Sequence, residues 1–144
     1  MITDPLQFNS QAGASRRGTA LIVDRDDKDL HSYAEVLCRM GFEVKTFLDF
    51  GEAARCLEHE TADFVLVSQG SPAFEGQGVV QQALAQDRHT PVIVVAPHLD
   101  LGCYLEAIQL GAADYLEKPL SPDDVEYLVT TFWRPHVLKM SSSA

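Results

Sequence analysis

The sequence predicts an α/β fold in which a parallel β-sheet is covered by helices on both faces. Five short apolar segments alternate with five segments whose apolar residues recur at helical spacing, which is typical of this class. One apolar segment, Val92–Ala96, has no polar residue at alternate positions, as expected for a strand that is buried on both faces. Residues that cap helices stand at the expected helix ends.

The expected strands are, in order, Ala20–Val23, Phe42–Thr46, Phe64–Val67, Val92–Ala96 and Ala113–Leu116. The helices between and after them are predicted from apolar residues three and four positions apart. These residues are Tyr33, Val36, Leu37 and Met40, then Ala53, Ala54 and Leu57, then Val79, Val80, Ala83 and Leu84, then Leu101, Leu105 and Ile108, and finally Val125, Leu128, Val129 and Phe132.

Residues at the helix ends agree with this assignment. Gly41 and Gly111 follow the first and fourth helices, where a glycine commonly adopts the left-handed conformation. Asp49 precedes the second helix as a candidate N-cap. The last helix is predicted to begin at Ser121-Pro122-Asp123-Asp124, which combines a cap, an early proline and acids in the first turn.

The chain of 144 residues fits one domain, with 46% hydrophobic and 22% charged residues. We predict a flexible N-terminal tail over residues 1–18, the domain over 19–133 and a C-terminal tail over 134–144. The net charge of −10 argues against a nucleic-acid partner and against an anionic membrane surface. The three cysteines lie far apart and suggest neither a disulfide nor a metal site. The sequence shows no secretory leader, so we expect a cytoplasmic location.

Several chemically informative residues follow the expected strands. Asp24 and Arg25 follow the first, Ser68 the third, Ala96 ends the fourth and Lys118 follows the fifth. In a parallel sheet these positions share one edge, where α/β proteins form their sites. Together with Pro72, Gly76, the segment Gly111-Ala112-Ala113-Asp114-Tyr115 and the pair Lys118-Pro119, they resemble the receiver domain of bacterial two-component response regulators, over roughly residues 19–133.

The resemblance implies a flavodoxin-like strand order, 2-1-3-4-5, with five helices. It also places Asp24 at a metal-binding acid, Tyr115 at the aromatic switch, and Lys118 at the lysine that contacts the phosphoryl group before a usually cis peptide bond. Three residues depart from the family pattern. Arg25 replaces the second acid, Ser68 replaces the phosphorylated aspartate, and Ala96 replaces the switch Thr or Ser.

These departures predict a degenerate receiver that is not an enzyme and has no cofactor. Asp24 is the one carboxylate left at a matched metal position, so Mg²⁺ binding is expected to be very weak or absent. Ser68 lacks an adjacent base, and its hydroxyl is expected to bond locally. We expect Lys118 to pair with Asp24. Acids at the start of the first helix, Asp26, Asp27 and Asp29, are expected to complement the helix dipole.

The resemblance also indicates how the domain acts. Receivers generally contact partners through the fourth helix, fifth strand and fifth helix, and we expect a signalling protein, with a homodimer as a further possibility. Leu101, Tyr104 and Tyr115 are the candidate contact residues, while Leu105 and Ile108 are expected to carry the core stripe of the fourth helix. Two alternatives remain: a small-anion sensor that uses Arg25 and Lys118, and a receiver phosphorylated at an unusual acceptor.

Overall fold

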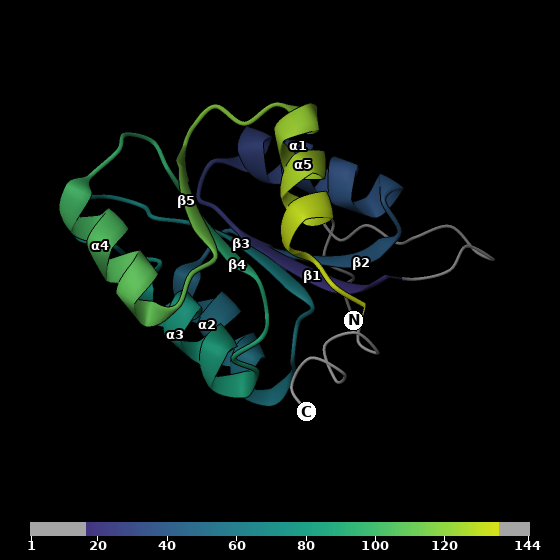
Figure 1. Ribbon diagram of the computed structural model, residues 1–144, viewed down its shortest axis with the longest axis horizontal. Coiled ribbons are helices and arrows are strands. Elements are labelled where there is room, and N and C mark those ends of the chain that lie inside the picture. Colours follow the sequence, from purple (N-terminus) through teal and green to yellow (C-terminus); the bar gives the residue numbers. More distant parts are fainter. Residues whose placement is uncertain (1–16, 136–144) are drawn as a thin grey trace.

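A five-stranded parallel sheet with the strand order β2-β1-β3-β4-β5 forms the centre of the molecule (Figure 1). The structure is a computed structural model that describes residues 17–135. The predicted fold class and strand order are confirmed. Of the two predicted tails, residues 1–16 and 136–144 lie outside the described residues.

The strands and helices alternate along the chain without exception. The strands are β1 (Gly18–Val23), β2 (Phe42–Phe47), β3 (Phe64–Ser68), β4 (Val92–Ala96) and β5 (Asp114–Glu117). The helices are α1 (Asp27–Arg39), α2 (Phe50–His59), α3 (Gln77–Gln86), α4 (Leu101–Leu110) and α5 (Pro122–Phe132). Every predicted element is therefore present, with strand boundaries shifted by at most two residues.

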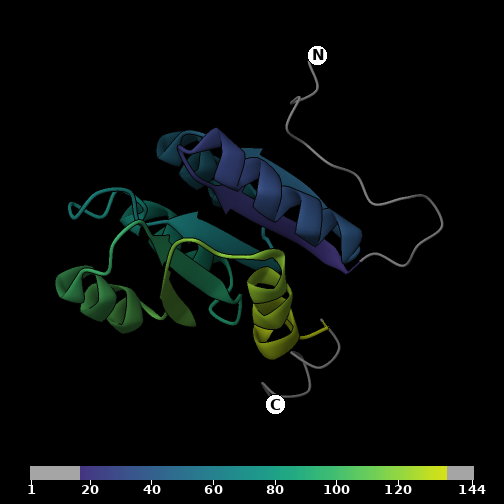
Figure 2. The ribbon, with the colours of Figure 1, turned by 90° about the horizontal axis from the view of Figure 1, so that it is seen from above.

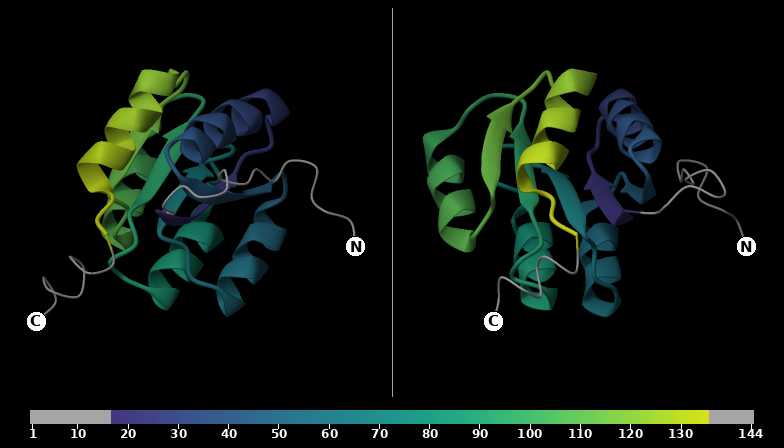
Figure 3. Two further views of the ribbon diagram at one scale, coloured as in Figure 1. Left: turned by 90° about the vertical axis from the view of Figure 1, so that its right-hand side faces the viewer. Right: turned by 45° about the vertical axis from the view of Figure 1, so that its right-hand side comes forward.

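Two hydrophobic layers enclose the sheet. Helices α1 and α5 cover one face, whereas α2 and α3 cover the other, and α4 lies beside β5 (Figures 2 and 3). Neighbouring residues of β1 divide between these layers, because successive side chains of a strand point to opposite faces. Ile22 packs with the α1 and α5 layer, and Leu21 packs with the α2 and α3 layer.

The predicted caps are present at the helix ends. Asp49 accepts a hydrogen bond from the backbone N–H of Glu52 at 2.9 Å. Ser121 and Asp124 form a capping box at the start of α5, with reciprocal bonds of 2.8 and 3.1 Å. Gly111 ends α4 at φ 111°, a left-handed conformation that costs glycine little. No helix within residues 17–135 is long and apolar enough to cross a membrane.

The orientation of α4 differs from the prediction. Leu105 and Ile108, expected in the core, are 49% and 41% exposed, whereas Cys103 and Ala107 are buried. The Cys103 thiol lies 3.4 Å from the carbonyl oxygen of Pro72, so the buried side of the helix contacts the loop after β3 at close range. Small side chains suit such an approach, and the larger apolar residues of α4 consequently face solvent.

Candidate functional site

The carboxyl edge of the sheet brings the predicted site residues together. Asp24 follows β1, Ser68 and Ala96 end β3 and β4, and Lys118 follows β5. The strand register pairs Ser68 with Val95 and Ala96 with Glu117, so these strand ends are level with one another. The peptide bond between Lys118 and Pro119 is cis. We name Asp24, Asp29, Ser68 and Lys118 the edge pocket.

Lys118 lies between two carboxylates. Its Nζ is 2.8 Å from Oδ2 of Asp24 and 2.8 Å from Oδ2 of Asp29, and its side chain is 17% exposed. The predicted pairing of Lys118 with Asp24 is thus confirmed. The contact with Asp29 was missed, because Asp29 lies in α1 and was expected only to complement the helix dipole. The other oxygen of Asp24, Oδ1, accepts from the backbone N–H of Asp26 at 2.9 Å.

Burial and pairing act against each other on these ionisable groups. Burial raises the pKa of Asp24 above its ordinary value, although the Lys118 ammonium lowers it. Burial also lowers the pKa of Lys118, but the hydrogen bonds to Asp24 and Asp29 outweigh this and leave it raised. Nearby, burial and the charges of the neighbouring acids raise the pKa of Tyr33, whose buried hydroxyl has no hydrogen-bond partner among residues 17–135. The contacts with Asp24 and Asp29 therefore keep the Lys118 side chain charged.

Asp26 has a structural role at the start of α1. Its Oδ1 accepts from the backbone N–H groups of Lys28 and Asp29 at 3.0 and 3.1 Å. These bonds lower the pKa of Asp26, because they favour its ionised form. The prediction that acids complement the start of this helix is confirmed for Asp26.

Ser68 is buried, and its hydroxyl is engaged locally as predicted. Its Oγ accepts a hydrogen bond from the backbone N–H of Gly70 at 3.1 Å. The loop that follows returns close to the strand, since a Cβ added at Gly76 would lie 2.2 Å from the Ser68 carbonyl oxygen. Only glycine fits at that approach. The loop therefore closes over the end of β3.

Arg25 does not contribute to the edge pocket. Its guanidinium lies over the Phe50 ring, 5.0 Å from the ring centroid, at the start of α2. This is a cation–π contact on the neighbouring helix. Ala96 is fully buried at the end of β4 and has no hydroxyl to offer. Within residues 17–135, no three His, Cys, Asp or Glu side chains gather in a way that could hold a metal ion.

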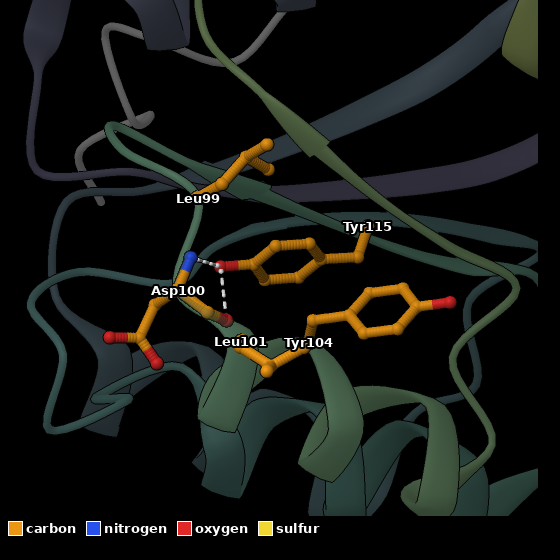
Figure 4. A pocket seen from close by; sticks show the side chains of 5 residues that line it. All are labelled: Leu99, Asp100, Leu101, Tyr104 and Tyr115. Carbon is orange, nitrogen blue, oxygen red and sulfur yellow. Dashed lines mark hydrogen bonds between the residues drawn. The ribbon is translucent and has the colours of Figure 1, made fainter.

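Tyr115 points inward and links β5 to the loops after β3 and β4. Its hydroxyl donates to Oε1 of buried Gln69. It also accepts from the backbone N–H of Asp100 at 3.1 Å, as Figure 4 shows. Gln69 is held in turn, because its amide donates to the Ser71 carbonyl oxygen at 3.1 Å. Sequence reasoning missed Gln69. A polar residue placed directly after a buried strand was the available signal.

Beside Tyr115, large side chains of α4 and of the preceding loop form an exposed apolar surface, which we name the α4 patch. Its members are Leu99, Leu101, Tyr104, Leu105 and Ile108, all at least 41% exposed. The Tyr104 ring meets the Tyr115 ring edge-on, with the centroids 5.7 Å apart. A cavity of about 450 Å³ is lined by these rings and by residues at the start of α4. Figure 4 shows the residues that line it. The predicted contact residues are therefore neighbours in space.

The family model of the response regulator receiver domain matches residues 20–130. The chain belongs to this family. It is thus a receiver domain of the kind found in two-component response regulators, and its five parallel strands and five helices form the flavodoxin-like fold of that family. The match covers the edge pocket, Tyr115 and the α4 patch.

Individual relatives agree with the family assignment. The chain is 32% identical over 114 residues to the DNA-binding transcriptional regulator NtrC of Klebsiella pneumoniae, covering 79% of this chain and 24% of NtrC. It is 33% identical over 99 residues to the transcriptional regulatory protein PrrA of Mycobacterium tuberculosis, covering 69% of this chain and 42% of PrrA. The chain therefore spans less than half the length of these relatives.

A solved structure extends the likeness to three dimensions. The CheY-like receiver domain protein from Methanospirillum hungatei superimposes with a TM-score of 0.73 at 25% identity, covering 82% of this chain and 93% of that protein. The shared fold places the carboxyl edge of the sheet at the same position in both molecules.

Proposed function

We propose that this receiver domain acts in two-component signalling by protein–protein contact, without aspartyl phosphorylation. The observation that carries the proposal is Ser68, which stands where the family resemblance places the phosphorylated aspartate. Its hydroxyl already accepts a bond from Gly70. A serine becomes a nucleophile when a base removes its proton. The pocket carboxylates, Asp24 and Asp29, are both engaged with Lys118, which supports a structural role for Ser68.

The residues present do not fit Mg²⁺. This ion needs near-octahedral oxygen ligands and usually takes one or two protein carboxylates. Asp24 is the single acid at a matched position, and Lys118 lies against its Oδ2. We therefore propose that the domain uses no metal, has no cofactor and is not an enzyme.

The alternative of a small-anion sensor is not favoured by the arrangement of the cations. Lys118 is flanked by two carboxylates, and Arg25 lies over Phe50 instead of the edge pocket. An entering anion would have to separate Lys118 from both acids or meet their repulsion. For the other alternative, no observation within residues 17–135 favours phosphorylation at a residue other than Ser68.

We propose that the signalling partner binds at α4, β5 and α5, where the α4 patch offers exposed apolar area. The proposed location is the cytoplasm. We propose neither a nucleic-acid nor a membrane contact, because the chain carries a net charge of −10. DNA binding is a property of NtrC, of which this chain covers 24%.

The test is chemical phosphorylation of the full chain with acetyl phosphate and Mg²⁺, followed by intact mass measurement. The unmodified chain is expected to keep its mass, whereas a receiver with an aspartate acceptor gains a phosphoryl group in parallel. The double variant Arg25→Asp/Ser68→Asp is expected to bind Mg²⁺ more tightly by calorimetry, since it restores two acidic positions. A hydroxylamine-labile adduct on the unmodified chain would refute the proposal.

A further inference from the structure

The surface formed by α4, β5 and α5 is apolar and acidic. Residues 99–132, which contain these three elements, include seven acidic residues and one basic residue, Lys118. That lysine belongs to the edge pocket, where both Asp24 and Asp29 hold its ammonium at 2.8 Å. The surface therefore presents no cation of its own from this segment.

The acids lie next to the apolar groups. Between β5 and α5 there is a cavity of about 300 Å³, and Asp114, Glu117 and Asp124 line it together with Leu116 and Tyr127. Across β5, the α4 patch borders the aromatic cavity at Tyr115 (Figure 4). The surface of α4, β5 and α5 thus offers cavities for apolar side chains next to acids that can pair with positive charges.

Symmetry argues against a second copy of this chain on the same surface. In a two-fold dimer the same patch meets itself, so each acid faces the partner copy's equivalent surface. Here that would bring acidic groups together without an intervening lysine or arginine, and like charges disfavour association. The basic residues of the secondary structure lie elsewhere, with Lys28 and Arg39 on α1, Lys45 on β2 and Arg55 on α2.

We propose that the α4–β5–α5 surface binds a basic, amphipathic segment of a different protein, one that carries apolar side chains next to lysine or arginine. The inference rests on the proposed function, of which it specifies the partner. The apolar side chains of the segment fill the cavity beside Tyr104 and Tyr115. Its cations pair with the acids of β5 and α5. Charge complementarity selects this partner over an acidic protein, a nucleic acid or an anionic membrane.

The probe is a synthetic helical peptide with leucine on one face and lysine on the other, added to the isotope-labelled full chain and followed by NMR. A peptide of the same pattern with glutamate in place of lysine is the control. The lysine peptide is expected to shift amide signals of α4, β5 and α5 and to bind more weakly as salt is added. Shifts concentrated on other elements, or equal binding of both peptides, would overturn the proposal.

Matched variants separate charge from shape. Glu117→Gln/Glu126→Gln removes two negative charges from the surface, and Glu35→Gln/Glu58→Gln removes two exposed ones from α1 and α2. The first double variant is expected to weaken peptide binding by roughly 2- to 30-fold, as for two exposed ion pairs. The second is expected to leave the affinity nearly unchanged. Equal losses from both would show that the peptide senses net charge alone, which contradicts the proposal.

Apolar anchoring is tested with Leu101→Asp against Leu48→Asp, two exposed leucines of which only the first belongs to the α4 patch. Leu101→Asp is expected to weaken peptide binding and Leu48→Asp to leave it unaffected. Sedimentation of the unmodified chain is expected to show a monomer. A dimer that Leu101→Asp dissociates would overturn the proposal in favour of a second copy. Acetyl phosphate could phosphorylate the unmodified chain while the lysine peptide still shifts the signals of α4, β5 and α5. That result would refute only the proposed function.

Discussion

The edge pocket and the α4 patch differ in how far their side chains are bonded within the chain. In the edge pocket, Lys118 pairs with two acids of the same chain, and the Ser68 hydroxyl accepts from a backbone N–H group. In the α4 patch, leucine and isoleucine side chains are exposed without comparable internal contacts. The charged and polar groups of the edge pocket are therefore already paired within the chain. The apolar side chains of the α4 patch are exposed and can contact another molecule.

Tyr115 connects the end of β3 with the α4 patch. Its hydroxyl bonds to Gln69 at the end of β3, while its ring contacts Tyr104 of the α4 patch. In a receiver that responds to phosphorylation, a ligand must distinguish two states of such an element. In this chain the inward Tyr115 hydroxyl contacts Gln69, and its ring lies against Tyr104 of the α4 patch.

The largest effect is expected from breaking the edge pocket with Lys118→Met. This leaves Asp24 buried beside Asp29 without its cation, so the free energy of unfolding should fall by about 3 kcal/mol near neutral pH. The control is Lys45→Met, which breaks the exposed pair with Glu60 and should cost at most about 1 kcal/mol. Urea unfolding of both variants measures the contrast, and equal losses would contradict it.

The loss in Lys118→Met should depend on pH. Burial already raises the pKa of Asp24, and removal of Lys118 raises it further. A carboxyl group with a raised pKa in the folded chain lowers stability as the pH rises from its unfolded pKa through its folded pKa. The deficit is therefore expected to be smaller near pH 5 than near pH 7.5. A deficit that grows toward acid pH would show that Asp24 is not the group left unpaired.

An intermediate effect is expected from Tyr115→Phe, which removes the hydrogen bond to Gln69 at the end of β3. Gln69 then keeps a buried carbonyl oxygen without its donor, so the free energy of unfolding should fall by about 1 to 3 kcal/mol. Tyr104→Phe is the control, since that tyrosine is exposed and should tolerate the change within about 0.5 kcal/mol.

A double-mutant cycle sharpens this test. Combining Tyr115→Phe with Gln69→Met should cost less than the sum of the single changes, because both remove the same hydrogen bond. Strict additivity would mean that the two side chains act independently, and the role assigned to Gln69 would have to be abandoned.

The smallest effect is expected from the α4 patch itself. Leu101 is 73% exposed, so Leu101→Asp should change the free energy of unfolding by no more than about 0.5 kcal/mol. Thermal and urea unfolding measure this value. A loss above 1 kcal/mol would place Leu101 in the core and remove the contrast with the edge pocket.

Local patterns in the sequence were sufficient for much of the molecule. Alternation and helical spacing located all ten elements, and the cap residues located the start of α5 at Ser121. The strand ends identified Asp24, Ser68 and Lys118 as neighbours, because parallel strands bring their carboxyl ends to one edge. These features depend on short stretches of chain, so the sequence alone was enough to predict them.

Tertiary structure decided which side of α4 is buried. The residues 101, 105 and 108 have the same helical spacing as 103, 107 and 110, so periodicity cannot distinguish the two stripes, and hydrophobicity favoured the wrong one. Close packing against the Pro72 loop selected the small residues Cys103 and Ala107. At this crowded contact the small size of the side chains mattered more than the larger hydrophobic gain from burying leucine. Such a contact leaves no local signal in the sequence.

Two other long-range contacts were likewise decided only by the folded chain, although the pairing of Lys118 with Asp24 was predicted. The Lys118–Asp29 pair spans 89 residues and the Tyr115–Gln69 bond spans 46. Arg25 could have entered the edge pocket by its place next to Asp24, but the Phe50 ring offered its guanidinium a surface elsewhere. The sequence determines which residues reach the carboxyl edge. Which of them touch there depends on distances and directions that arise only when helices and loops pack together.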